Sequence, residues 1–111
     1  MASCRDVVLH ASAAETTSGS QIMQIDRMKS GIFWLDVTAC AGGSDTLDVK
    51  IQDGPDGSLW TDVTGLSFTQ ATAATTERKA VSQLGPWIKA SWTVGAGTTV
   101  TFSLKGHMDE V

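Results

Sequence analysis

Apolar and polar residues alternate one by one along several short segments of this chain. In the segment 46–53, Leu47, Val49 and Ile51 alternate with polar residues. Because successive side chains of a β-strand point to opposite faces, these three residues are predicted to face a core. The same pattern predicts strands at 4–11, 32–41, 87–94 and 98–104, and weaker strands at 21–26, 60–63 (resuming at 66–70) and 77–81.

Turn-forming residues separate these strands at intervals of roughly ten residues, which is typical of all-β sandwiches. The clearest turn is Asp53–Gly57, where Pro55 has a fixed φ angle and the glycines tolerate positive φ. No helical segment separates the strands, so a parallel sheet is not expected. The sequence therefore predicts an all-β fold, an antiparallel β-sandwich or jelly roll of seven or eight short strands, as a single domain over residues 1–111.

Two β-hairpins are predicted where a strong strand, a glycine-rich turn and a second strong strand follow one another. They join 32–41 to 46–53 across the turn 42–45, and 87–94 to 98–104 across the turn 95–97.

The two ends of the chain are polar. The small, polar N-terminal segment, which reaches to about Ser20, is expected to form an edge strand or a loop that orders on docking to a partner. Residues from 105 onward are expected to form a short C-terminal tail that frays. Trp60 opens a short strand after a turn and is predicted to close one end of the core.

The charge balance argues against a protein that binds nucleic acid. The 111 residues carry a formal net charge of −4, and Lys and Arg occur singly except for Arg78–Lys79. A nucleic-acid-binding surface needs a stripe of basic residues that neutralises phosphates. There is also no signal-peptide pattern and no apolar window of the roughly 18 residues that cross a bilayer. A soluble protein made in a cytoplasm, with neither nucleic acid nor membrane as partner, is expected.

No combination of residues in the sequence indicates an enzyme, a cofactor or a metal. There is no G-x-G-x-x-G or Walker A motif, and no catalytic triad follows from the spacing. His10 and His107 have no Cys or Glu at metal-ligand spacing and are interpreted as surface histidines. Cys4 and Cys40 lack a C-x-x-C pattern and are interpreted as reduced thiols, with Cys40 half-buried and a disulfide left open.

The turn 53–57 carries two carboxylates, Asp53 and Asp56. Two carboxylates in a glycine-containing turn are compatible with a calcium-binding loop, but the turn lacks the full D-x-[DN]-x-[DN]-G-x5-E pattern. We interpret both side chains as acceptors for turn amides. Because the turn projects from the fold, Asp53 and Asp56 are candidate contact residues.

Two tryptophans fall opposite the predicted core faces. Trp92 shares its face with Ile88 and is assigned to the core, whereas Trp34 and Trp87 point the other way. Outward aromatic residues mark protein contacts or sugar-stacking platforms, although a loop covering them would bury them equally well. Trp34 and Trp87 are therefore candidate contact residues.

Seven segments, taken in order, resemble a family of small virion proteins of tailed bacteriophages. The match spans about nine-tenths of the chain. One departure is Pro86–Lys89, where the family usually has Arg-Tyr-Val-Arg, so that the positive charge moves. The matching segments are 9–14, 35–39, 47–52, 54–57 with Trp60, 68–70, 84–95 and 101–104.

The resemblance implies a non-enzymatic structural role in the virion, made in the host cytoplasm. Such proteins often decorate (cement) the phage head by binding the major capsid protein, commonly as a homotrimer, while others sit in the head–tail connector or the tail. The competing class is a carbohydrate-binding module on the virion surface, with Trp34 or Trp87 as the stacking platform.

Overall fold

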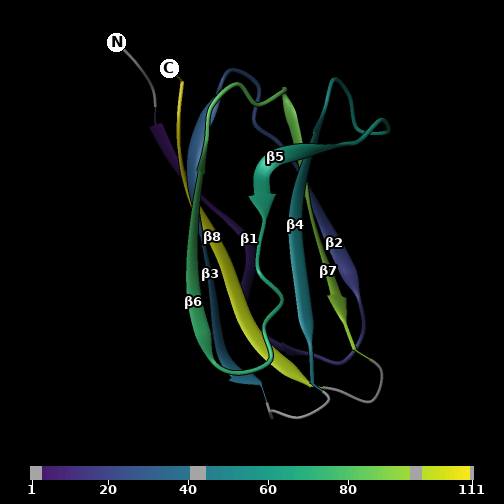
Figure 1. The fold of residues 1–111 in the computed structure, drawn as a ribbon. Helices are drawn as coiled ribbons and strands as arrows, with labels where there is room; N and C mark the ends of the chain where they lie inside the picture. The colour runs from purple at the N-terminus through teal and green to yellow at the C-terminus, as the bar shows by residue number, and fades with distance from the viewer. Residues whose placement is uncertain (1–3, 41–44, 96–98, 111) are drawn as a thin grey trace.

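The computed structural model describes residues 4–40, 45–95 and 99–110, and in them eight strands form two antiparallel sheets (Figure 1). The first sheet has the strand order β1-β8-β3-β6 and the second has the order β2-β7-β4-β5. The described residues contain no helix of a length and apolarity that would cross a membrane. The strands are β1 (Cys4–Glu15), β2 (Gly19–Gln24), β3 (Ser30–Cys40), β4 (Leu47–Gly54), β5 (Thr61–Ser67), β6 (Thr75–Val81), β7 (Trp87–Val94) and β8 (Val100–Asp109).

The topology is that of an eight-stranded jelly roll. Successive strands alternate between the two sheets, with β4 and β5 the one consecutive pair of described strands that shares a sheet. The prediction of an antiparallel β-sandwich or jelly roll is therefore confirmed.

The two predicted hairpins are wrong. β3 pairs with β6 and β8, whereas β4 pairs with β5 and β7, so the segments 32–41 and 46–53 lie in opposite sheets. The same holds for β7 and β8. A glycine-rich turn reverses the chain but does not fix whether the next strand pairs with the last one or crosses to the other sheet. The turn residues 42–44 and 96–97 lie outside the described residues.

The inward faces are those that the alternation predicted. Leu47, Val49 and Ile51 of β4 are buried, and Phe33 and Phe102 are fully buried. Facing side chains from both sheets therefore form one apolar core between the two layers. Trp60, predicted to close one end of this core, is instead half-buried beside Lys89, an outward residue of β7.

Both polar ends are strands. β1 runs to Glu15 and pairs with β8, and β2 begins at Gly19, so the N-terminal segment is already paired without a partner protein. β1 and β2 lie at the edges of their sheets, so the N-terminal segment forms edge strands rather than a loop. The predicted fraying tail from residue 105 is wrong, because β8 continues to Asp109 with Gly106 and Met108 facing inward. The inward residue Gly106 has no apolar side chain, so the alternation is not visible in this part of the sequence.

Candidate functional site

The candidate contact residues Trp34 and Trp87 lie on opposite sides of the molecule. Trp34 belongs to β3 and alternates with the buried Phe33 and Leu35, so it faces outward from the first sheet. Trp87 precedes the buried Ile88 on β7 and faces outward from the second sheet. The two rings therefore do not form a common platform.

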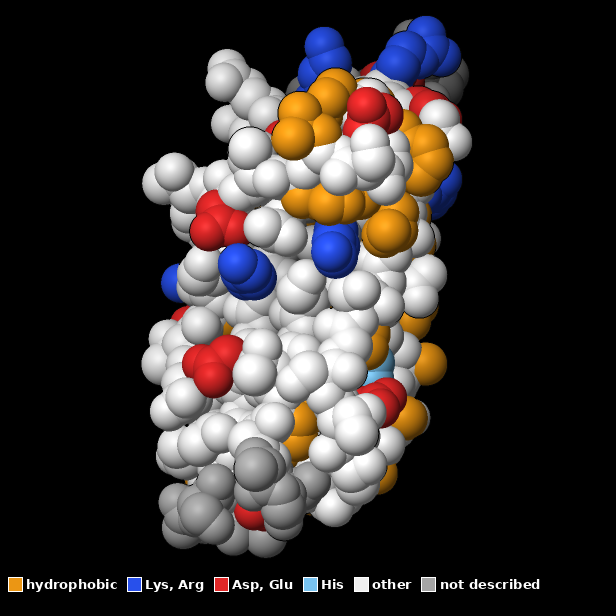
Figure 2. All heavy atoms as spheres, turned by 90° about the vertical axis from the view of Figure 1, so that its right-hand side faces the viewer, with side chains coloured by type: hydrophobic (Ala, Val, Ile, Leu, Met, Phe, Trp, Pro, Cys, Tyr) orange, Lys and Arg blue, Asp and Glu red, His pale blue; other side chains and the backbone are white. Residues whose placement is uncertain are grey.

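The outer surface of the second sheet carries an aromatic patch, which we define as Ile22, Trp60, Trp87 and Lys89. Ile22 is opposite Lys89 in the β2–β7 register, and the Lys89 ammonium lies 5.9 Å from the Trp60 ring centroid. Ile22 is 42% exposed. Figure 2, which views the side of the molecule that carries β2, shows hydrophobic side chains gathered towards its upper end.

The turn between β4 and β5 passes close to Trp87. A Cβ atom at Gly57 would lie 3.7 Å from the Trp87 ring, so the turn borders the aromatic patch. Gly54 is opposite Trp87 in the β4–β7 register. The structure thus brings Trp87 together with the turn that contains Asp53 and Asp56, while Trp34 stands apart.

The carboxylates of Asp53 and Asp56 accept hydrogen bonds from backbone amides. Asp56 Oδ1 accepts hydrogen bonds from the Ser58 amide (2.8 Å), the Leu59 amide (2.9 Å) and the Ser58 hydroxyl (3.0 Å). The amide of Ser58, then that of Leu59, holds the pKa of Asp56 below its ordinary value. Asp53 Oδ2 accepts from the Gly85 amide at 2.8 Å. The predicted role as an acceptor of turn amides is confirmed for Asp56, whereas Asp53 accepts from an amide in the distant segment before β7. The role of both residues in partner contact stays a prediction.

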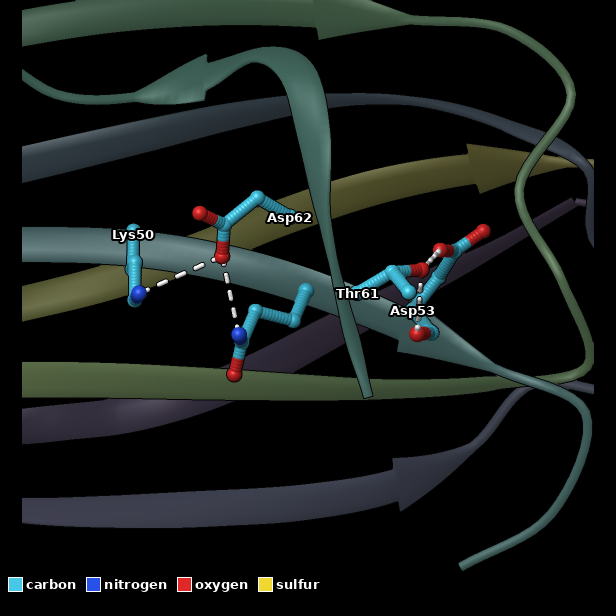
Figure 3. A network of polar contacts seen from close by, with 5 residues as sticks. Lys50, Asp53, Thr61 and Asp62 are labelled. Carbon is cyan, nitrogen blue, oxygen red and sulfur yellow. Dashed lines mark hydrogen bonds and ion pairs between the residues drawn. The ribbon is translucent and has the colours of Figure 1, made fainter. Parts of the chain in front are cut away.

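Polar contacts beside the patch hold β5 onto β4 (Figure 3). Asp62 Oδ1 accepts hydrogen bonds from Gln52 Nε2 (2.8 Å) and Lys50 Nζ (3.2 Å). The hydrogen bond from Gln52, followed by that from Lys50 and its positive charge, lowers the pKa of Asp62. These groups form a polar border next to Lys89, which is opposite Gln52 in the sheet register.

The outer surface of the first sheet carries a second apolar feature, the Trp34 row, which we define as Val8, Lys105 and Trp34. Register pairs Val8 with Lys105 and Lys105 with Trp34, so the three residues cross the sheet side by side. Val8 is 51% and Trp34 is 37% exposed. They border a shallow hollow of about 450 Å³, which Asp6 and His107 also line.

His10 is buried, and its assignment to the surface is wrong. The β1–β8 register shifts on either side of His10, so this bulge turns both Leu9 and His10 toward the interior. His10 Nδ1 lies 3.0 Å from the carbonyl oxygen of Phe102, and Nε2 lies 2.7 Å from Glu15 Oε2. A bulge breaks the two-residue period, so the alternation in the sequence did not reveal this burial.

His107 is half-exposed, as a surface residue would be. Its Nδ1 lies 2.7 Å from Asp6 Oδ1 on the neighbouring strand β1. This hydrogen bond, with a smaller contribution from the charge of Asp109, raises the pKa of His107 above its ordinary value. Cys4 is exposed and Cys40 is half-buried, and within the described chain neither forms a disulfide.

Comparison with known proteins finds a similar fold in solved structures of several kinds of protein. No protein-family model matches the chain, and a search of curated proteins gives no match. The SPBc2 prophage-derived protein YomS is similar in structure (TM-score 0.61, 13% identity), with 98% of this chain and 95% of that chain covered. The PBSX exported protein XepA is also similar in structure (TM-score 0.66, 14% identity). The match covers 94% of this chain and 36% of XepA. A third similar structure is a CBM4 (TM-score 0.53, 15% identity). The match covers 89% of this chain and 66% of the CBM4 chain. At these identities the likeness shows a shared fold.

Proposed function

We propose that this chain is a non-enzymatic structural protein of a tailed-bacteriophage particle, and that it decorates the head. Its partners would be the major capsid protein and further copies of the chain. The observation that supports this proposal is the presence of exposed apolar features on both outer faces, the aromatic patch on the second sheet and the Trp34 row on the first. A protein that joins neighbours in a shell needs at least two separate contact surfaces.

The chemistry of both surfaces suits protein contacts. Tryptophan buries a large area on binding and is enriched among the residues that dominate interface energy. Each surface also carries a lysine beside its tryptophan, Lys89 near Trp60 and Lys105 next to Trp34. Each contact can be weak, because many copies bind one shell and neighbouring copies reinforce one another. The resemblance to virion proteins and the fold shared with the prophage-derived YomS are consistent with this role.

Co-sedimentation with phage heads assembled without this protein tests the proposal. We expect the purified chain to bind such heads in many copies, and Trp34→Ala and Trp87→Ala each to weaken binding at least about tenfold. Thr72→Ala, in the connection before β6, is the matched surface control and is expected to bind as the parent does. Binding that neither tryptophan variant reduces would contradict the assignment of the two contact surfaces.

Cryo-electron microscopy of the decorated heads then locates the protein. Density at the three-fold axes of the capsid supports decoration by a homotrimer, and the mass of the purified protein in solution checks the trimer independently. Density confined to the connector or tail would overturn the head assignment and favour the alternative position in the particle.

A carbohydrate-binding module is the second candidate, because Trp60 and Trp87 lie on one outer face beside polar groups. Stacking on aromatic rings, with hydrogen bonds from neighbouring polar side chains such as Gln52, is a chemistry that suits sugars. This candidate predicts glycan-array binding that Trp87→Ala abolishes and Trp34→Ala leaves unchanged. Equal binding by the parent and Trp87→Ala, or none by either, would exclude a sugar site at this patch.

A further inference from the structure

The two ends of the chain bring four metal-binding or polar side chains together on the outer face of the first sheet. The β1–β8 register pairs Cys4 with Asp109 and Asp6 with His107. Val7 and Met108 alternate with these residues and are buried, so all four side chains point outward. Residues about a hundred positions apart in the sequence therefore share one small area.

Three of these side chains present donor atoms to one another. The Cys4 sulfur, a ring nitrogen of His107 and a carboxylate oxygen of Asp109 all lie within 4.8 Å of one another. The His107 Nε2 to Asp109 Oδ1 distance is 3.6 Å. In a tetrahedral zinc site with ordinary bond lengths, neighbouring donor atoms are separated by about 3.3–3.6 Å. The His107–Asp109 pair already has that separation, and the sulfur of the exposed Cys4 side chain lies within 4.8 Å of both.

The fourth residue, Asp6, orients the imidazole. The ionised Asp6 carboxylate accepts hydrogen bonds, so the 2.7 Å contact places a proton on His107 Nδ1. The neutral ring then carries its lone pair on Nε2, the nitrogen that faces Asp109. A carboxylate on the far nitrogen of a metal-binding histidine fixes its tautomer and strengthens it as a ligand.

We propose that Cys4, His107 and Asp109 bind a divalent zinc-type ion, with Asp6 as the residue that positions His107 and water in the fourth place. A thiolate, an imidazole and a carboxylate together favour zinc over calcium or magnesium, which take oxygen ligands. Binding displaces the Cys4 thiol proton to the buffer, and the thiolate sulfur forms the bond to the metal. The spacing rules applied to the sequence did not find this set, because its ligands come from two paired strands rather than from one motif.

The ion would join the paired ends of β1 and β8, where Cys4 is opposite Asp109. β1 is an edge strand of the first sheet and pairs only with β8 among the described strands. A bound ion would therefore stabilise the terminal part of this ladder, since it binds the folded arrangement and not the separated ends. This inference does not depend on the proposed role in the virion.

Titration of the reduced, full-length chain with Co²⁺ tests the site directly, because cobalt replaces zinc and reports its ligands in the visible spectrum. The measurement belongs at about pH 8, because protons compete with the metal for the His107 ring and for the Cys4 thiolate. We expect one Co²⁺ per chain, with the intense bands of a tetrahedral site and a thiolate charge-transfer band. Zn²⁺ is expected to displace it and to raise the melting temperature.

Matched variants separate the roles of the four residues. Cys4→Ser should abolish the thiolate band, while Cys40→Ser, the other cysteine of the chain, should leave the spectrum unchanged. Asp6→Asn should keep the bands but weaken affinity about 10–100-fold. Thermal melts without metal check that every variant folds. The site is overturned if the parent binds no stoichiometric cobalt, or if Cys4→Ser keeps the thiolate band. An unchanged affinity in Asp6→Asn would overturn its positioning role.

Discussion

Replacement of His10 by alanine is expected to lower the free energy of unfolding by about 2–4 kcal/mol. The ring stacks on Phe102 with centroids 3.9 Å apart and meets Trp92 edge-on at 4.8 Å. Alanine would leave a cavity between these rings and would remove the contacts to the Phe102 carbonyl and to Glu15. Denaturant unfolding followed by tryptophan fluorescence measures the loss.

Two comparisons make the His10 prediction specific. His10→Phe keeps the aromatic ring but removes both polar contacts, so it should destabilise less than His10→Ala. In metal-free buffer, His107→Ala changes the half-exposed histidine and should shift the denaturation midpoint far less than His10→Ala does. Equal denaturation midpoints for His10→Ala and His107→Ala would contradict a stabilising role for the buried contacts of His10.

Replacement of Gly106 by alanine is expected to destabilise the protein by about 1–3 kcal/mol. Gly106 stands between Val7 and Phe33 in one inward row across the first sheet. A Cβ atom there would lie 2.7 Å from Phe33 Cδ1 and 3.1 Å from Val7 Cγ2. Phe33 is fully buried, so its ring cannot turn away without disturbing the core. The ring occupies the space that the missing side chain leaves, as aromatic residues do opposite strand glycines.

Gly57→Ala is the matched control, because its added Cβ would meet the Trp87 ring at an ordinary 3.7 Å. Its free energy of unfolding should stay within about 0.5 kcal/mol of the parent's. The double variant Gly106→Ala with Phe33→Leu should cost less than the sum of the two single changes, because the smaller side chain relieves the clash. Equal midpoints for Gly106→Ala and Gly57→Ala would contradict the close packing of Phe33 on Gly106.

The positions at which the sequence misled all involve relations between strands. His10 follows the inward residue Leu9, so the alternation predicts that His10 faces outward. In the structure a bulge at this point directs both side chains inward. Trp60, predicted to close the core, lies just before β5 and beside Lys89 on the outer face. Local hydropathy does not reveal where a ladder gains an extra residue or which outer face a loop crosses.

The candidate contact surface was predicted in part. Alternation alone placed Trp34 and Trp87 on outward faces, since their strand neighbours are strongly apolar. It did not reveal that the two faces belong to opposite sheets, or that Ile22 and Trp60 join Trp87. Those relations follow from sheet order and register, which join segments far apart in the chain.

The sequence by itself determined most of the strands, most of their inward faces and the two-layer antiparallel class, because a two-residue hydrophobic period is a local property of the backbone. Tertiary structure alone decided the jelly-roll order, the burial of His10, the packing of Phe33 over Gly106 and the meeting of Cys4 with His107 and Asp109. Each of these depends on which strands pair and in what register. Pairing between distant strands is set by how all the apolar faces are buried together, and no single segment carries that information.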